Sequence, residues 1–195
     1  MNVTQKPHSD SRLPQLLDES ARLFRAQGFE GTSMRDIARA VGMLPGSLYC
    51  HFATKEDLLG AIYLKGVTQI SQAVQTAVAR HTDPWSRLEA ACTAHLDSVL
   101  HDDDYAQVVV RVRPSDVAPA MRHLVELRNR YEALFVALIK DLPLPRGTDR
   151  RALRLLLMGA LNWSQTWYQP NGRFKPRTIA RKFITLLRQS QEIPK

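Results

Sequence analysis

The segment from Thr32 to Phe52 constrains the fold most strongly, because two short helical patterns meet within it at a glycine. Before Gly42, apolar residues recur at helical spacing: Met34, Ile37, Ala38 and Val41. Pro45 then stands where a new helix begins, since its fixed φ and missing N–H cost nothing in a first turn. Two short helices joined by such a turn are typical of a helix-turn-helix, whose second helix enters the major groove of DNA.

The rest of the sequence follows the same helical period, interrupted by prolines and glycines. From these interruptions we expect further helices over residues 13–27, 54–79, 84–100, 116–142, 149–168 and 176–190. Residues 105–112 are β-branched and apolar, which also fits a strand, but no partner strand is visible and we expect a short helix. The predicted fold class is therefore all-α with about nine helices, and residues 1–11 are expected to form a disordered tail.

The net charge of +8 agrees with a polyanionic partner, but its distribution does not mark the motif. Residues 1–60 carry seven Lys and Arg against seven Asp and Glu, whereas residues 171–195 carry seven against one. The helix-turn-helix pattern, and not the total charge, therefore carries the prediction of DNA binding.

No segment predicts export, a membrane span or a bound metal. The longest apolar run, residues 155–161, is too short to cross a bilayer, and residues 1–30 lack the apolar stretch of a secretory signal. We therefore expect a cytoplasmic protein. Cys50 and Cys92 lack the paired spacing of a metal site, so we expect free thiols, no metal and no cofactor.

The second helix of the motif turns polar side chains outward while Leu48 packs against the first helix. A recognition helix places its N-terminal residues nearest the base edges, so we expect DNA contacts from this face. Thr32 and Ser33 are suited to cap the first helix and to donate to a phosphate, and Arg35 and Lys55 supply cations for the DNA backbone. The predicted DNA-binding residues are Thr32, Ser33, Arg35, Pro45, Gly46, Ser47, Tyr49, His51 and Lys55.

The stretch from Phe24 to Leu59 resembles the TetR family of regulators, with GFEGTSMRDIARAVG, GSLYCHF and TKEDLL in that family's order and spacing. The resemblance implies a three-helix DNA-binding domain, a larger helical ligand-binding domain and a homodimer. We therefore expect a DNA-binding domain over residues 12–58, with the helix-turn-helix at about 33–52. Residues 59–195 are expected to form the ligand-binding and dimerisation domain.

Carried over by position, the resemblance implies contacts with the DNA backbone or bases from Tyr49, His51 and Lys55. It also implies hydroxyl contacts from Thr32 and Ser47. The sequence departs from the family at Leu44, where a Ser or Thr commonly caps the recognition helix. We therefore expect the start of this helix to lack a side-chain cap and the phosphate contact that goes with it.

Residues 149–168 and 176–190 resemble the helix pair through which this family dimerises as a four-helix bundle. The first segment is apolar nearly all round, which requires burial on more than one face, and the second carries an apolar stripe. Packing within one subunit is the alternative explanation. The predicted dimer-interface residues are Leu153, Leu157, Leu161, Phe183, Leu186 and Leu187.

The segment GALNWSQTWYQPNGR, residues 159–173, resembles a subgroup whose effectors include acyl-CoA thioesters and other lipid-derived molecules. Arginines between residues 111 and 154 suit the phosphates of CoA, because a guanidinium donates to them through a bidentate fork; a solvated basic face also explains these arginines. The predicted ligand-binding residues, each of which equally fits a core position, are Tyr105, Val109, Arg128, Tyr131, Asn162, Trp163 and Trp167.

These observations predict a DNA-binding transcriptional regulator, and more narrowly a repressor that a lipid-derived or acyl-CoA effector releases from double-stranded operator DNA. A drug-responsive efflux regulator of the same fold is the alternative. A small helical enzyme is disfavoured, because the sequence lacks a Gly-rich phosphate loop, paired metal-ligand spacing and a nucleophile motif. An adaptor that does not bind DNA is disfavoured because Tyr49 and Lys55 are present.

Overall fold

The computed structural model describes residues 12–101, 103–113, 115, 117 and 121–191. Within these ranges the chain forms nine α-helices and a short 3₁₀ turn, and no strand, which confirms the predicted all-α class. In chain order the elements are α1 (Leu13–Gln27), α2 (Met34–Ala40), α3 (Pro45–His51), α4 (Lys55–Val78), α5 (Pro84–Leu100), α6 (Asp104–Arg111), α7 (Met121–Lys140), α8 (Arg150–Trp163), η2 (Ser164–Thr166) and α9 (Pro176–Gln191). The tail expected at residues 1–11 lies outside the described residues.

Side-chain caps fix where several of these helices begin. Ser33 and Asp36 form a reciprocal capping box at the start of α2, and Thr54 and Asp57 form another at the start of α4. Each box satisfies backbone N–H groups that have no partner within the helix. The Ser33 and Thr54 boxes therefore set the boundaries of the helix-turn-helix on both sides.

Three segments test the boundary predictions most directly. The β-branched stretch predicted at 105–112 is helical up to Arg111, as α6, and Asp103 caps its start by accepting the N–H of Ala106. Among the described residues α7 begins at Met121 rather than at 116; residues 116 and 118–120 lie outside the description. Helix α8 ends at Trp163, and the chain continues as the 3₁₀ turn η2 instead of reaching 168 as an α-helix.

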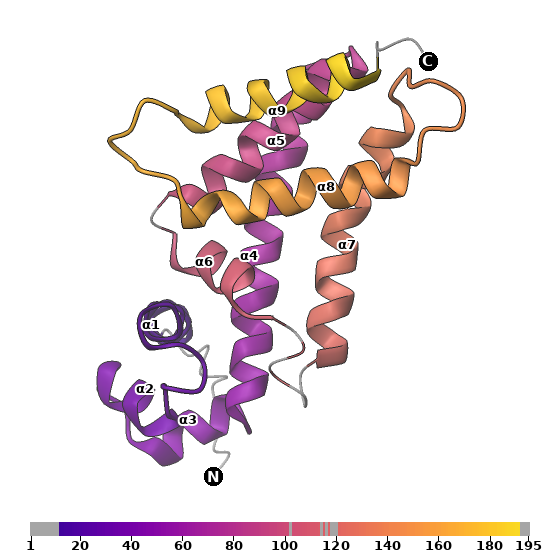
Figure 1. Ribbon diagram of the computed structural model, residues 1–195. Helices are drawn as coiled ribbons and strands as arrows, with labels where there is room; N and C mark the ends of the chain where they lie inside the picture. The colour runs from indigo at the N-terminus through magenta and orange to yellow at the C-terminus, as the bar shows by residue number, and fades with distance from the viewer. Residues whose placement is uncertain (1–11, 102, 114, 116, 118–120, 192–195) are drawn as a thin grey trace.

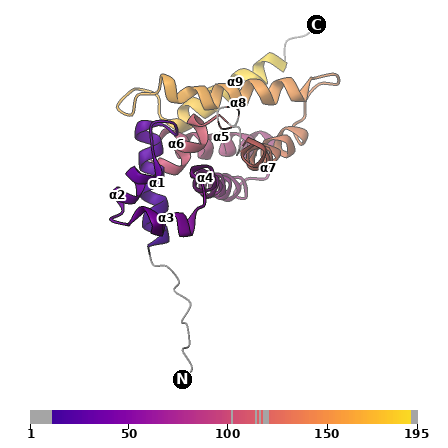
Figure 2. The same cartoon turned by 90° about the horizontal axis from the view of Figure 1, so that it is seen from below.

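Helix α4 joins the two ends of the molecule. In Figure 1 the helices α1, α2 and α3 lie at the lower end, α4 rises from them, and α8 and α9 cross the upper end. Seen from below, in Figure 2, α7 lies on the opposite side of α4 from α1–α3. Helix α4 packs against α1, α5, α6 and α7, so it links the helix-turn-helix to the larger helical body.

One continuous apolar core runs along α4. Leu58, Leu59 and Ile62 are fully buried near the helix-turn-helix, and Ile70 and Val74 are buried farther along the same helix. Within the described part of the chain, no helix is both long enough and apolar enough to cross a membrane. The burial along α4 means that the two ends of the molecule share one core.

The approach of α6 to α4 depends on Gly66. A Cβ atom at this position would lie 2.7 Å from the carbonyl oxygen of Tyr105 and 2.7 Å from Cγ2 of Val109. Real Cβ atoms do not approach backbone this closely, so any larger residue would push the two helices apart. Helix α6 is therefore held directly against the middle of α4.

Candidate DNA-binding face and ligand pocket

The two helices of the helix-turn-helix are joined by buried apolar side chains. Ile37 of α2 and Leu48 of α3 are both completely buried, and Val41 and Met43 are buried in the turn between them. Leu48 is the only residue of α3 whose side chain is buried. All other side chains of α3 are therefore wholly or partly available to a partner.

The outward face of α3 presents the residues predicted for DNA contact. Pro45, Gly46, Ser47 and Tyr49 are exposed, and 52% of Tyr49 is accessible to solvent. His51 at the end of α3 is half-buried. This face matches the prediction that the second helix turns its polar side outward.

Leu44 occupies the N-cap of α3 without forming a side-chain hydrogen bond, in agreement with the expected departure from the family pattern. Its side chain is 77% exposed, an unusual position for a leucine. The start of the recognition helix therefore presents a bare apolar side chain next to backbone N–H groups that no side chain caps.

Three other predicted contact residues are engaged within the protein. Thr32 is buried, and its hydroxyl donates to the carbonyl oxygen of Gly28 at 2.8 Å, so it faces inward instead of toward a phosphate. The Ser33 hydroxyl donates to Asp36 at 2.5 Å within the capping box. The Lys55 ammonium donates to the carbonyl oxygens of Phe29 and Thr32 at 2.7 and 3.0 Å.

Lys55 also lies over the ring of Phe29, with its nitrogen 4.1 Å from the ring centroid. Its side chain therefore ties the start of α4 to the loop between α1 and α2. Arg35, by contrast, is exposed on α2, and its side chain forms no hydrogen bond or ion pair within the described part of the chain. Of the two cations predicted to meet the DNA backbone, Arg35 is therefore the more exposed.

A second feature is a pocket of about 440 Å³ enclosed by α4, α5, α6, α7 and α8. Its volume suits a small organic molecule, and most of its wall is apolar. Four of the seven predicted ligand-binding residues line it: Val109, Arg128, Tyr131 and Asn162. Arg113, one of the arginines expected to suit the phosphates of CoA, also lines it, and so do Tyr63, His95 and Met158, which the sequence did not single out for this role.

A chain of three hydrogen-bonded side chains forms the polar wall of the pocket. The Nδ1 atom of His95 lies 2.6 Å from the Tyr131 hydroxyl, and Nε2 lies 3.1 Å from Oδ1 of Asn162. All three groups are satisfied when Tyr131 donates to Nδ1 and the Nε2–H donates to Asn162. The Asn162 amide N–H groups then remain available to donate to a ligand.

Burial lowers the pKa of His95 to about 4, against the raising effect of its hydrogen bond to Asn162. The imidazole is therefore neutral at neutral pH, as the hydrogen-bond pattern requires. Burial also raises the pKa of Tyr131 well above its usual value, so its hydroxyl keeps the proton. The polar wall of the pocket therefore carries no charge.

Charged side chains lie where the pocket meets solvent. Arg113 and Arg128 both line the pocket and are exposed. Arg128 lies 3.5 Å from Glu132, which also pairs with the partly buried Arg154. The pocket therefore combines an apolar wall, a neutral polar group and, at its edge, two guanidinium groups and the Glu132 carboxylate.

The other three predicted ligand residues lie elsewhere. Trp163, the last residue of α8, and Trp167, which follows η2, are 68% and 45% exposed and do not line the pocket. Tyr105 is on α6, but its side chain points to the junction with α1. The expectation that these aromatic rings form the pocket wall is therefore not met by the geometry.

At that junction Tyr105 forms a polar cluster with α1 and α4. Its hydroxyl donates to Asp18 at 2.5 Å, and Lys65 donates to Asp18 at 3.1 Å and to the Tyr105 oxygen at 2.8 Å. The hydrogen bond from Tyr105, together with Lys65, holds the pKa of Asp18 below its usual value despite partial burial. The cluster connects three helices through one charged network.

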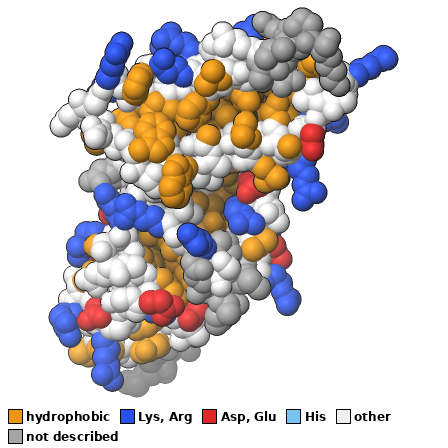
Figure 3. Space-filling view, in the orientation of Figure 1, with side chains coloured by type: hydrophobic (Ala, Val, Ile, Leu, Met, Phe, Trp, Pro, Cys, Tyr) orange, Lys and Arg blue, Asp and Glu red, His pale blue; other side chains and the backbone are white. Residues whose placement is uncertain are grey.

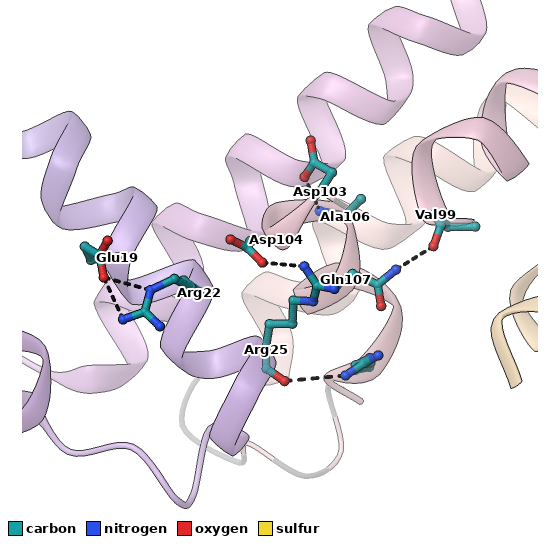
Figure 4. Close-up of polar contacts among 9 residues, drawn as sticks. Glu19, Arg22, Arg25, Val99, Asp103, Asp104, Ala106 and Gln107 are labelled. Atoms are coloured by element: carbon teal, nitrogen blue, oxygen red, sulfur yellow. Dashed lines mark hydrogen bonds and ion pairs between the residues drawn. The ribbon is translucent and has the colours of Figure 1, made fainter. Parts of the chain in front are cut away.

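A second link joins α1 to α6. Figure 4 shows Arg25 of α1 reaching Asp104 at the start of α6, with a distance of 2.8 Å between the charged atoms. The same view shows Gln107 donating to the carbonyl oxygen of Val99, which ties α6 to the end of α5. Helix α6 thus lines the pocket on one side and is bonded to the DNA-binding end on another.

The outer face of α8 is apolar and uncovered, whereas that of α9 is mainly basic and polar with one exposed leucine. Figure 3 shows hydrophobic side chains gathered over the face of the molecule on which α8 lies. Leu155 and Leu156 are 53% and 66% exposed, and Leu186 of α9 is 63% exposed. A contiguous exposed apolar surface of this kind marks an interaction site.

The predicted interface residues are divided between this face and the core. Leu153, Leu157 and Leu161 are buried inside the chain, because they occupy the inner side of α8, and Leu187 is buried as well. They are therefore not available to a second copy. Leu186 is exposed and Phe183 is half-buried, so only these two of the six lie at or near the surface.

A helical chain with a helix-turn-helix at one end and a ligand-sized pocket in the body belongs to the class of DNA-binding regulators that sense small molecules. Two family models match it: "Bacterial regulatory proteins, tetR family" over residues 16–62 and "Tetracyclin repressor-like, C-terminal domain" over residues 81–190. The chain belongs to the TetR family of transcriptional regulators.

Individual relatives agree with this assignment over nearly the whole chain. The transcriptional repressor KstR2 of Rhodococcus jostii (strain RHA1) is 26% identical over 202 residues, covering 95% of this chain and 96% of that protein. The crystal structure of the superantigen PfiT is 28% identical with a TM-score of 0.77, covering 91% of this chain and 96% of PfiT. AibR, solved with isovaleryl coenzyme A and operator DNA, also has a TM-score of 0.77, at 24% identity and coverages of 90% and 97%, and this likeness shows the fold.

The buried imidazole predicts a pH dependence of stability. Because the pKa of His95 falls from 6.5 to about 4 on folding, the unfolded chain binds more protons between these values. The free energy of unfolding should therefore decrease as the pH falls from about 6.5 to about 4, by up to about 3 kcal/mol. Urea denaturation at a series of pH values measures it.

The matched variants are His95→Gln, which cannot titrate, and His101→Gln at an exposed histidine. His95→Gln should flatten the profile in this window, whereas His101→Gln should follow the wild type. The carboxyls of Asp18, Asp36 and Asp83, whose pKa values are lowered, change the free energy of unfolding at a lower pH than this window. Identical profiles for the wild type and His95→Gln would show that His95 does not cause the effect.

Proposed function

We propose that this protein is a homodimeric repressor in the cytoplasm that leaves its operator when an acyl thioester occupies the pocket. The observation that carries the proposal is the combination within the pocket of an apolar wall, an uncharged His95–Tyr131–Asn162 chain and two edge arginines. The name of KstR2 as a repressor supports the direction of control. AibR, a protein of the same fold, was solved with a coenzyme A thioester.

The proposed ligand matches the pocket in three parts. A hydrocarbon chain fits the apolar wall formed by residues such as Ile70 and Met158. A thioester carbonyl can accept from the Asn162 amide, whereas a free carboxylate would lose its hydration beside an uncharged wall. The coenzyme phosphates suit Arg113 and Arg128, because guanidinium groups bind phosphates by charge-assisted hydrogen bonds.

Helix α6 provides a route from this pocket to DNA. Val109 and Val110 touch the pocket, while Tyr105 and Asp104 of the same two-turn helix are bonded to Asp18 and Arg25 of α1. A ligand that displaces α6 therefore also moves α1. The ligand lowers operator affinity only to the extent that it binds the DNA-free conformation more tightly than the DNA-bound one. A tenfold loss of operator affinity requires a difference in binding free energy of about 1.4 kcal/mol.

The proposed dimer uses the exposed apolar face of α8 together with Leu186 of α9. A helix-turn-helix protein needs two heads at a fixed spacing to read two half-sites, and a two-fold dimer supplies them. Leu155, Leu156 and Leu186 would be covered by the same residues of a second copy. Burial of this face removes the most exposed leucines of the two C-terminal helices from water, which favours association.

The DNA contact predicts different effects for two cations. Arg35→Ala should weaken binding to DNA of any sequence and reduce the slope of log affinity against log salt by about 0.9, because one phosphate contact is lost. Lys55→Ala should leave that slope unchanged and lower stability by about 1–2 kcal/mol, because the carbonyls of Phe29 and Thr32 lose their donor. Fluorescence anisotropy with promoter DNA and urea denaturation measure the two quantities. If Lys55→Ala reduces the salt slope and leaves the free energy of unfolding unchanged, Lys55 contacts a DNA phosphate instead.

The effector proposal is tested by titrating the protein–DNA complex with acyl-CoA esters of several chain lengths, the matching free acids and unrelated aromatic drugs. Acyl-CoA should lower operator affinity tenfold or more, and free acids should not. Arg128→Gln should weaken the binding of acyl-CoA but not that of the acyl thioester of N-acetylcysteamine, which has no phosphate. Arg122→Gln, at an exposed arginine of α7, is the control and should change the binding of neither thioester. Mass spectrometry should recover the thioester intact. Release by drugs alone would indicate an efflux regulator, and hydrolysis of the ester would indicate an enzyme.

The dimer prediction is tested by sedimentation at micromolar concentration. The wild type should sediment as a dimer, and Leu156→Glu should yield folded monomers that lose specific operator binding, since a buried charge without a partner is costly. Leu64→Glu is the matched control, because Leu64 is 45% exposed on α4 and lines a hollow to which neither α8 nor α9 contributes a residue. A monomeric wild type, or dissociation by Leu64→Glu alone, would contradict the proposed interface.

A further inference from the structure

A second cleft, of about 650 Å³, lies on another side of α6 from the ligand pocket. It is enclosed by α1, the end of α5, α6 and the segment from η2 to the start of α9, and we call it the α1–α6 cleft. Gln107 and Arg111, one turn apart on α6, line this cleft, whereas Val109 and Val110 line the ligand pocket. The two cavities share no lining residue, so the α1–α6 cleft is separate from the site of the proposed effector.

Three cationic side chains converge on this cleft from different elements: Arg25, Arg111 and Lys175. Arg25 pairs with Asp104, as Figure 4 shows. Arg111 and Lys175 instead donate to the carbonyl oxygens of Arg25 and Pro170, at 3.4 and 2.8 Å. Within the described part of the chain neither forms an ion pair with a carboxylate, so both retain charge for an anion.

The other ionisable groups of the cleft do not cancel this charge. Asp97 is the only acidic residue among those that line it, and three cationic side chains line the cleft with it. His101 also lines the cleft, and its Nδ1 lies 2.5 Å from the carbonyl oxygen of Asp97. The cleft therefore has a cationic excess at neutral pH.

The floor of the cleft is suited to a flat or apolar group. Leu100 and the Tyr168 ring are half-buried and line the cleft, and Pro176 is buried beside them. The Gln107 amide donates to the carbonyl oxygen of Val99 at 2.5 Å, which leaves its own oxygen as an acceptor. Gln165 adds a second amide. An aromatic ring with polar edge atoms has partners here both for its face and for its edge.

We infer that the α1–α6 cleft binds a small phosphorylated molecule with a ring body, of the nucleoside monophosphate class. The phosphate lies between Arg111 and Lys175, because a phosphate ester carries nearly two negative charges and guanidinium and ammonium groups are its usual partners. The ring lies on the floor beside Tyr168, within hydrogen-bonding reach of the Gln107 oxygen.

The position of the cleft gives such a ligand a regulatory role. Arg25 belongs to the DNA-binding end, whereas Arg111 and Lys175 belong to the helical body. Because Arg111 also donates to the carbonyl oxygen of Arg25, a molecule bound between Arg111 and Lys175 holds the junction between α1 and α6. Its binding therefore changes operator affinity through the same junction that the pocket ligand moves.

Calorimetry on the full chain tests the inference with adenosine monophosphate, and with adenosine and inorganic phosphate as its two halves. Adenosine monophosphate should bind at least tenfold more tightly than either half. Arg111→Gln and Lys175→Gln should each weaken it tenfold or more, whereas Arg122→Gln and the pocket variant Tyr131→Phe should not. Thermal melts identify any variant that fails to fold, and the two cleft variants lie on different elements, so one failure leaves the other informative.

Coenzyme A carries a nucleoside phosphate itself, so its binding is measured in a separate titration. Sensitivity of coenzyme A binding to Arg111→Gln, without binding of adenosine monophosphate, would support the phosphate site and identify the coenzyme as its source. No binding of either molecule would overturn the inference. Equal weakening by Arg111→Gln and Arg122→Gln would also overturn it, because binding would then follow net charge and not the cleft.

Discussion

The close approach of α6 to α4 at Gly66 is the contact on which the functional arrangement depends. With no side chain at this position, the backbone of Tyr105 lies directly against α4, and α6 occupies the centre of the molecule. From there one short helix contacts the pocket, the end of α5 and α1. A larger residue at position 66 would open this packing and separate the ligand pocket from the DNA-binding end.

Local sequence patterns predicted the parts of the molecule that local interactions form. The helix-turn-helix follows from apolar spacing, Gly42 and Pro45, and the bare N-cap at Leu44 was readable directly from the residue type. The short helix α6 was predicted against the β-branched character of its residues, and Asp103 supplies the physical reason by capping its start. In each case the residues that determine the structure lie within one or two turns of each other.

Long-range contacts account for what the sequence did not reveal. His95 lies 36 residues from Tyr131 and 67 from Asn162, so no spacing marks it as part of a polar chain. Lys55 has the residue type of a phosphate contact, but its nearest acceptors are carbonyls supplied by the α1–α2 loop. The face of α8 was ambiguous for a related reason: leucines lie all round it, and only its packing determines that Leu157 is inside.

The recognition helix is attached to the rest of the protein with little of its own surface. Leu48 is the one residue of α3 with a buried side chain, while Pro45, Gly46, Ser47 and Tyr49 are exposed. Substitutions at the exposed positions of α3 therefore carry a small cost in folding stability, because surface changes away from special features usually do. Operator preference in this protein can consequently diverge by single steps through folded intermediates, with the pocket, the dimer face and α6 left unchanged.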